Sequence, residues 1–166
     1  MKVLTFSRTF PKHHARASEP TYFVQRIKQS IFGKSDKNEI WHPKHHTIRA
    51  GHRWKVGDKA SLRVWEKDGG RFAKGNKQIE FAEVEIKKVW DFELEKLNKY
   101  SILCLSIQDY HYPITSHPIH SGLIKKIAQN DGLELADFIS WFHLGRYIIP
   151  SFAGQIICWA DEVNYD

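Results

Sequence analysis

The sequence predicts an α+β fold in which about six strands form a small, mostly closed barrel and about three helices flank it. Strand-like and helix-like segments do not alternate along the chain, as they would in a parallel α/β sheet. The chain has 166 residues, which suits one domain with one core. Hydrophobic residues make up 42% and charged residues 27%, a balance typical of globular proteins.

The N-terminal segment predicts a strand followed by a helix. The apolar run in Lys2–Phe6 indicates a short strand. Pro20 suits the first position of a helix, where its missing N–H has no intrahelical partner. The apolar residues that follow recur every four positions and therefore share one helical face, at Phe23, Ile27 and Ile31. Gly33 is placed to end this helix.

Two strands are predicted next, over His46–Ala50 and Lys59–Trp65. In the second strand, small and aliphatic side chains alternate with polar or larger ones, as in a strand with one buried face. Gly57-Asp58 is a turn signal that joins the two segments. Both strands are therefore assigned to the predicted barrel.

A basic, glycine-rich and mobile loop over 68–76 is predicted to precede a longer strand. Residues 78–89 alternate as a strand does, but the alternation slips near Ala82, which predicts a β-bulge there. Residues 100–107 are almost continuously apolar. We expect them to form a central strand that is covered on both faces.

Helical periodicity returns in the C-terminal part. Helices are predicted over 121–130 and 133–142. In the second helix, apolar side chains at spacings of three and four residues form one stripe, at Leu135, Phe138, Ile139 and Phe142. Residues 155–160 complete the predicted fold as a last strand.

Positive charge is concentrated near the N-terminus. The formal net charge is +6, and residues 1–60 contain 13 Lys and Arg against 4 Asp and Glu. The remaining residues contain 12 against 15, and six of the ten histidines also lie within 1–60. This concentration favours an anionic partner, and we expect RNA or a nucleotide-like molecule.

The composition also bears on the compartment. No apolar run approaches the roughly 20 residues of a membrane span, and the first ten residues are too polar for a signal segment. Cys104 and Cys158 lie in apolar runs without a CxxC pair, so we expect two buried, reduced thiols. We therefore expect a cytoplasmic protein with no membrane partner. Protein partners stay unknown at this point.

The segment richest in chemistry is 41–53. Thr47 and Arg49 point to the same side of an extended strand, because side chains repeat every two residues. Lys44, in the loop after Pro43, can fold back toward the Thr47 hydroxyl. A hydroxyl, an ammonium and a guanidinium around one spot suit a phosphate, a carboxylate or a polarised carbonyl oxygen. A solvated basic strand edge would explain the same residues equally well.

A family resemblance runs through this segment. The motif is Lys44-x-x-Thr47-Ile48-Arg49, followed by Trp54-Lys55-x-Gly57-Asp58-x-x-Ser61-x-Arg63. It resembles the activating-signal cointegrator homology (ASCH) family, whose PUA-like domains line a cleft with a small barrel and a flanking helix. The resemblance covers most of the chain and is strongest between residues 42 and 64. It implies a single ASCH, PUA-like domain over 1–166, with an extended N-terminal strand and helix.

The resemblance implies binding of RNA or a modified nucleoside in a basic cleft, since PUA-like domains generally handle such ligands. One bacterial ASCH branch removes the acetyl group from N4-acetylcytidine with a Lys, a Thr and a Glu, and another is reported to cleave RNA. Lys44 and Thr47 match the first two residues, while Asp131 stands in place of the Glu. The family glycine two residues before the lysine is His42 here. The alternatives are a nucleoside amidohydrolase, a ribonuclease and a non-catalytic RNA reader.

For the amidohydrolase, roles follow from the chemistry. The Thr47 hydroxyl attacks the amide carbonyl, and Lys44 acts as base if burial lowers its pKa. Arg49 or Lys44 stabilises the oxyanion, and Asp131 transfers a proton to the leaving amine. The cationic, imidazole and aromatic side chains expected to contact the ligand are Arg49, Arg63, His46, Trp41 and Tyr22.

Neither a cofactor nor a metal ion is expected. The clustered histidines are His42, His45, His46 and His52. They lack the HExxH spacing of a zinc site, and no Cys pair lies nearby. They could instead bind phosphate or serve acid–base cleavage of RNA. Trp65 and Trp90 are expected to pack rather than to bind a ligand.

Overall fold

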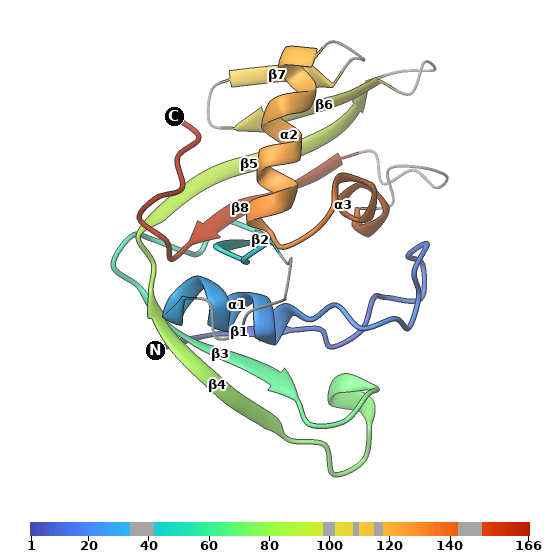
Figure 1. Cartoon of the computed structure of the whole chain (residues 1–166), viewed down its shortest axis with the longest axis vertical. Helices are drawn as coiled ribbons and strands as arrows, with labels where there is room; N and C mark the ends of the chain where they lie inside the picture. Colours follow the sequence, from blue (N-terminus) through green and yellow to red (C-terminus); the bar gives the residue numbers. More distant parts are fainter. Residues whose placement is uncertain (34–41, 98–101, 108–109, 115–117, 143–150) are drawn as a thin grey trace.

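The computed structural model describes residues 1–33, 42–97, 102–107, 110–114, 118–142 and 151–166 (Figure 1). The elements in chain order are β1 (Lys2–Phe6), α1 (Phe23–Phe32), β2 (His46–Ala50), β3 (Lys59–Trp65), the 3-10 helix η1 (Gly70–Phe72), β4 (Gln78–Glu85), β5 (Lys88–Leu97), β6 (Ile102–Ile107), β7 (Tyr110–Ile114), α2 (Pro118–Asn130), α3 (Leu135–Trp141) and β8 (Ser151–Cys158). The mixture and its order confirm the predicted α+β class.

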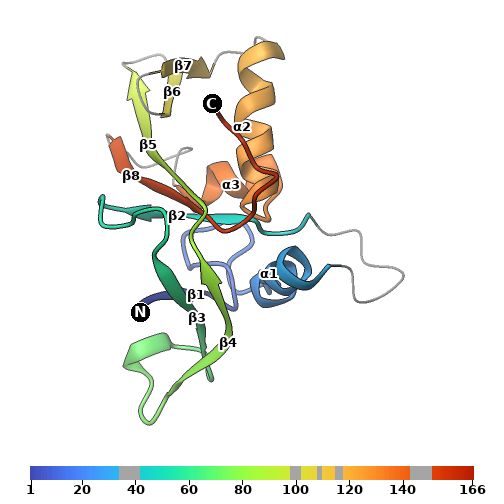
Figure 2. The same cartoon turned by 90° about the vertical axis from the view of Figure 1, so that its left-hand side faces the viewer.

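The strands of the described residues form two sheets. One has three strands in the order β1-β3-β4, with β1 parallel and β4 antiparallel to β3. The other has five antiparallel strands in the order β2-β8-β5-β6-β7. Neither sheet closes on itself within the described ranges, so the structure does not confirm the predicted closed barrel. Figure 2 shows the three helices on one side of the molecule and the sheets on the other.

The chain crosses from one sheet to the other between β4 and β5, which Figure 1 shows as one long, bent ribbon. The predicted strand 78–89 is therefore two strands that meet at a corner. Ile86 lies at this corner, fully buried, and its backbone pairs with Gly57 and Asp58. The predicted turn at Gly57-Asp58 thus anchors the corner, while β2 and β3 on either side of it belong to different sheets.

The β-bulge predicted near Ala82 is confirmed. Leu62 pairs with Ala82 and Arg63 pairs with Glu80, so Phe81 is the extra residue. Its ring contacts the ring of Phe6 on β1 at 6.1 Å between centroids. The extra residue therefore turns an aromatic side chain toward the core.

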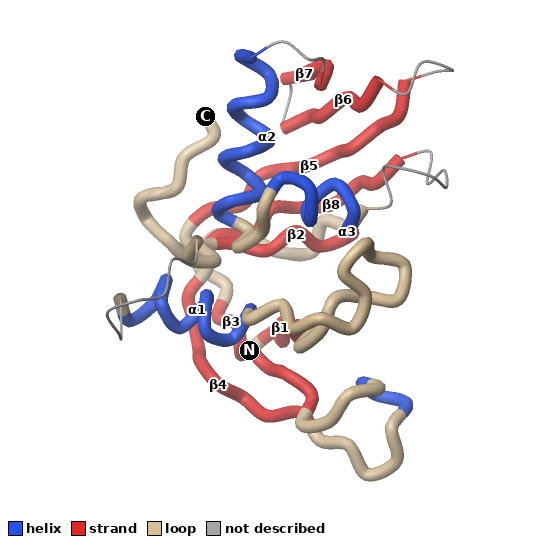
Figure 3. The backbone as a smooth tube through the Cα atoms, turned by 45° about the vertical axis from the view of Figure 1, so that its right-hand side comes forward, coloured by secondary structure: helices blue, strands red, loops and turns tan. Residues whose placement is uncertain are grey.

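Helix α1 begins later than the sequence predicts. Pro20 forms an isolated bridge with Thr9 instead of opening the helix. Tyr22 then adopts a left-handed backbone conformation with φ 57°, and the helix begins at Phe23. It ends before Gly33, as predicted. The loop between β1 and α1 reaches across to α3 (Figure 3).

The C-terminal half follows the predicted order with shifted bounds. Helix α2 begins three residues before 121, and α3 begins two residues after 133. The strand β6 has neighbours on both sides, as expected of the apolar run 100–107. Strand β7 and residues 90–97 of β5 were not predicted. None of the helices in the described ranges is long and apolar enough to cross a membrane.

Apolar side chains fill the space between the sheets and the helices. Phe6 from the three-stranded sheet meets Trp159, just beyond β8, with perpendicular rings 6.3 Å apart. Trp90 is buried, as predicted, and Cys158 is a buried free thiol. Gly154 on β8 allows β2 to pair closely, because a Cβ there would overlap the carbonyl oxygen of Arg49. This close pairing positions β2, the strand that carries the motif residues Thr47 and Arg49.

Candidate functional site

A cavity of about 270 Å³ lies where the motif strand β2 meets β1, α1 and α3. It is lined by Thr5, Phe6, Ser7, Phe23, Lys44, Thr47, Ile48, Arg49, Trp65, Asp131, Trp141 and Phe142. The volume is near the lower end of the range for small-molecule sites, roughly 300–1,000 Å³. Four predicted site residues, Lys44, Thr47, Arg49 and Asp131, therefore converge on one cavity.

Backbone contacts bring Lys44 and Asp131 together. The two residues form an isolated antiparallel bridge, and the neighbouring His45 N–H donates to the carbonyl of Asn130 at 2.8 Å. The Lys44 Nζ donates to the Asp131 backbone oxygen at 2.6 Å and to Oδ1 at 2.5 Å. An ammonium has three donors, so one of them is left without a partner among the described residues.

The Lys44–Asp131 pair is buried, with only 1% of Lys44 exposed. Burial lowers the pKa of Lys44 to about 8, and the Asp131 charge limits this fall. For Asp131, burial acts to raise the pKa, but the attraction of Lys44 and His46 outweighs it and leaves the pKa below its ordinary value. At neutral pH the pair is therefore an ammonium and a carboxylate.

Gly132 makes room for this pair. Its φ of +72° lies in the left-handed region that favours glycine. A Cβ at this position would come within 3.0 Å of the Lys44 Cβ and 3.2 Å of the Arg26 Cδ. The Asp-Gly turn after α2 is thus both ordinary turn chemistry and part of the packing around the lysine.

Thr47 and Arg49 lie on the same side of β2, as the two-residue repeat predicts. The Arg49 Nη2 donates to the Thr5 carbonyl at 2.6 Å, and its guanidinium lies 5.3 Å from the Phe6 ring centroid. Its Nε is buried without a hydrogen-bond partner among the described residues. The Thr47 hydroxyl likewise makes no hydrogen bond within the described ranges. Thr47 and Arg49 both line the cavity, so the hydroxyl and the guanidinium can contact a ligand there.

Aromatic rings form the walls of the cavity. The Lys44 ammonium lies 4.4 Å from the centroid of Phe23 and 5.9 Å from that of Phe6. Trp65, which was predicted to pack, is only half-buried and lines the cavity with Trp141. Flat apolar walls around charged donors suit a planar polar ring.

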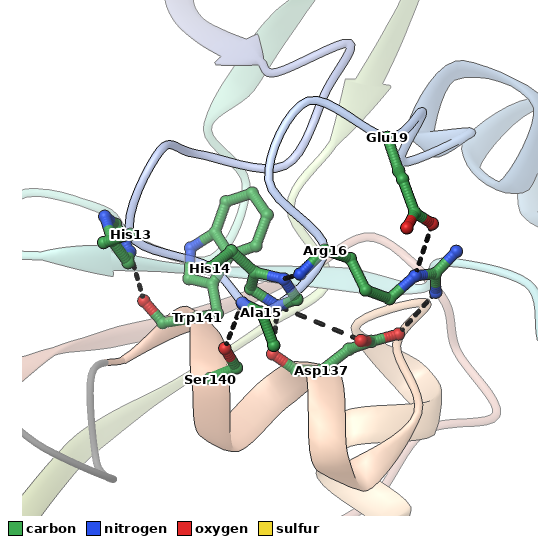
Figure 4. Close-up of polar contacts among 8 residues, drawn as sticks. All are labelled: His13, His14, Ala15, Arg16, Glu19, Asp137, Ser140 and Trp141. Carbon is green, nitrogen blue, oxygen red and sulfur yellow. Dashed lines mark hydrogen bonds and ion pairs between the residues drawn. The ribbon is translucent and has the colours of Figure 1, made fainter.

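The loop between β1 and α1 holds α3, and with it Trp141, at the cavity (Figure 4). The His14 Nδ1 accepts from the Arg16 N–H, so Nε2 carries the proton and donates to the Asp137 carbonyl at 2.9 Å. The Arg16 guanidinium donates to the Asp137 carboxylate at 2.9 Å. The ring of Phe10 packs on His14 at 4.2 Å and on Trp141 at 5.9 Å.

His46 was expected to contact the ligand, but the structure buries it completely behind Asp131 and outside the cavity lining. Its Nε2 lies 2.8 Å from the Tyr165 hydroxyl, which also accepts from Asn130 at 2.9 Å. Its Nδ1 faces Asp131 Oδ1 at 3.6 Å, which is too long for a hydrogen bond. In this structure His46 can support Asp131 but cannot reach a ligand in the cavity.

Two other predicted ligand contacts, Arg63 and Tyr22, are not among the residues that line this cavity. Arg63 donates to the Ser61 hydroxyl and lies 3.6 Å from the carboxylate of Glu80. Tyr22 lines a separate, smaller cavity of about 140 Å³. Trp41 lies outside the described residues. Among the predicted ligand contacts that the structure describes, Arg49 alone lines the cavity.

Sequence reasoning missed most of the apolar lining. These residues are Phe6, Phe23, Trp65, Trp141 and Phe142. Phe6 and Phe23 were read only as strand and helix residues, and periodicity does not tell a core side chain from one that lines a cavity. Tyr165, next to the last residue of the sequence, carried no sequence signal, since its role depends on a contact with His46 across the fold.

The histidines clustered in residues 42–52 do not line the cavity. His42 faces Glu134, His45 faces Glu162 and His52 faces Asp91, at 3.2, 3.2 and 3.6 Å. Within the described part of the chain, no group of three or more His, Cys, Asp or Glu side chains is arranged to hold a metal ion.

No protein-family model matches the chain, and neither a curated protein nor a solved structure is detectably similar to it.

Proposed function

We propose that this chain is an ASCH-type, PUA-like domain that binds a modified nucleoside, free or within RNA, in the cavity around Lys44. The observation that supports this most is the combination of an ammonium, a guanidinium and a hydroxyl with aromatic walls in one cavity. A nucleobase offers a flat face for stacking and carbonyl oxygens as acceptors. The cavity volume suits one base or one nucleoside rather than a folded RNA segment.

The hydrogen-bonding capacity of the cavity supports a ligand rich in acceptors. Lys44 has one donor left after its two bonds to Asp131. Arg49 and the Thr47 hydroxyl add further donors at the cavity wall. A carbonyl-bearing ring would accept hydrogen bonds from these groups.

The motif supports the family assignment within this proposal. Lys44, Thr47 and Arg49, the three residues that define the motif, all line the cavity. The anionic partner expected from the charge of residues 1–60 fits a nucleotide or RNA.

Hydrolysis of an amide on the bound base is a second candidate function, favoured by the lowered pKa of Lys44. The neutral amine would take the proton from Thr47 as the hydroxyl oxygen bonds to the amide carbonyl carbon. Collapse of this adduct would break the C–N bond, and the Lys44 ammonium would return the proton to the leaving amine. Water would then hydrolyse the ester on Thr47.

Arg49 and Asp131 take supporting roles in this chemistry. The Arg49 guanidinium would stabilise the oxyanion. Asp131 is a carboxylate at neutral pH, so we assign it to holding Lys44 rather than to the proton transfer expected from sequence. The ribonuclease alternative gains no support, because no histidine among the described residues lines the cavity.

The test is to titrate the purified protein with acylated and unmodified nucleosides and to analyse the products. Binding is followed by tryptophan fluorescence, since Trp65 and Trp141 line the cavity. Thr47→Val should abolish turnover and leave the fold intact, because valine keeps the β-branched shape. Arg63→Gln is the matched control: it belongs to the same motif but lies outside the cavity, so binding and turnover should persist.

Two results would decide between the candidates. If no substrate turns over but nucleosides bind, Thr47→Val should weaken binding by only about 0.5–1.5 kcal/mol, the worth of one hydrogen bond, and the protein is a reader. If the Thr47 and Arg63 variants bind every nucleoside equally well, the cavity is not the binding site and the proposal is wrong.

A further inference from the structure

The β3–β4 hairpin ends in an arm, residues 66–77, that extends away from the body of the protein (Figures 1 and 2). The arm has a defined conformation. The Asn76 side chain accepts from the Lys67 N–H and donates to the carbonyls of Lys67 and Gly70, at 2.8, 2.8 and 2.9 Å. The arm contains the 3-10 helix Gly70–Phe72.

This 3-10 helix presents the aromatic ring of Phe72 to solvent. Phe72 is 84% exposed, the largest exposure among the exposed large hydrophobic residues of the described chain. The Arg71 guanidinium lies 4.7 Å from the centroid of this ring. An isolated exposed phenylalanine with a cation beside it buries no apolar surface in the protein, so the fold alone does not explain it.

The arm is also basic. Its exposed cations are Lys67, Arg71, Lys74 and Lys77. Its acidic residues are Glu66 and Asp68. None of the four cations forms an ion pair with a carboxylate in the described ranges, whereas the exposed Lys87 lies 3.0 Å from Glu85. Four cations against two carboxylates leave the arm with a net positive charge, and the Arg71 guanidinium lies beside the exposed ring.

The arm begins at the cavity. Trp65, the last residue of β3, lines the cavity. A Cβ placed on Gly70 would lie 3.7 Å from the Trp65 indole, so the 3-10 helix packs back on Trp65. The Arg8 guanidinium, next to the cavity residue Ser7, donates to the Glu66 carbonyl at 2.7 Å. The arm therefore starts at the cavity wall, and Trp65 and Arg8 link the two.

We propose that the arm is a docking surface for single-stranded RNA, and that it holds the nucleotides that flank the one bound in the cavity. This inference rests on the proposed function and decides its substrate class in favour of an RNA strand over a free nucleoside. The Phe72 ring stacks on the open face of an unpaired base, whereas neighbouring bases cover that face in a duplex. The cations contact phosphates.

The experiment measures fluorescence anisotropy of a labelled, unstructured RNA of roughly 12 nucleotides over a series of salt concentrations. Phe72→Ala should weaken binding about 5- to 150-fold, the effect of losing one stacked base. The double variant Arg71→Gln, Lys74→Gln should lower the slope of log affinity against log salt by about 1.4, or roughly 0.7 for each phosphate contact. Lys87→Gln, an exposed lysine outside the arm, should match the parent.

The same variants are titrated with the free nucleoside bound by the parent, to separate the arm from the cavity. Unchanged nucleoside affinity together with weakened RNA binding supports the inference. RNA affinity equal to that of the parent in both arm variants overturns it, and leaves the cavity proposal to its own test. Arm-dependent binding to vesicles containing phosphatidylserine, with no arm-dependent RNA binding, also overturns it and assigns the arm to a membrane surface.

Discussion

The buried amine of Lys44 allows a prediction on how stability depends on pH. The pKa of Lys44 is about 8 in the folded protein, against about 10.5 for a lysine in water. Between these values the unfolded chain holds more protons on this residue than the folded one, so raising the pH favours folding. The difference corresponds to about 3 kcal/mol at 1.36 kcal/mol for each pH unit. This group should therefore add about 3 kcal/mol of stability between pH 8 and pH 10.5.

The perturbation that isolates this contribution is Lys44→Met, which keeps the length of the side chain and removes the titration. Urea unfolding of parent and variant is measured from pH 7 to pH 10.5. Groups distant from Lys44 titrate equally in both proteins, so the difference in the free energy of unfolding reports Lys44 together with its buried neighbours Asp131 and His46. It should change by about 3 kcal/mol in favour of the parent as the pH rises through this window.

Lys28→Met is the control, because Lys28 is an exposed lysine on α1. The free energy of unfolding of the Lys28→Met variant should follow that of the parent at every pH. Asp131→Asn removes the charge that limits the fall of the Lys44 pKa, so the gain in stability should begin below pH 8. Parallel curves for the parent and Lys44→Met across the whole range would refute the buried pair as described.

Three further outcomes are expected. Gly132→Ala should destabilise the fold by about 1–3 kcal/mol in thermal unfolding, because alanine is strained at this left-handed position and its Cβ would press on Lys44. Tyr165→Phe should cost about 1–3 kcal/mol, since His46 and Asn130 lose a partner inside the protein; an unchanged melting temperature would contradict this. If Lys44 is the base in hydrolysis, turnover should rise with pH and level off near pH 8.

Local patterns predicted much of the fold. The bounds of β1, β2 and β3 agree with the sequence prediction, as does the end of α1 before Gly33. These elements depend on side-chain alternation and on glycine conformation, which are properties of neighbouring residues. The pairing of β2 with β8, rather than with β3, depends on contacts between segments about 100 residues apart, and no local pattern contains that information.

The site divides in the same way. By itself, the sequence determined that Lys44, Thr47 and Arg49 could face one spot, because the two-residue repeat of a strand follows from backbone geometry. Only the tertiary structure decided that the spot is a cavity with aromatic walls, and that Asp131 pairs with Lys44 while His46 lies behind it. The physical reason is burial: packing removes water from the lysine and lowers its pKa, and that packing is made by side chains distant in the chain.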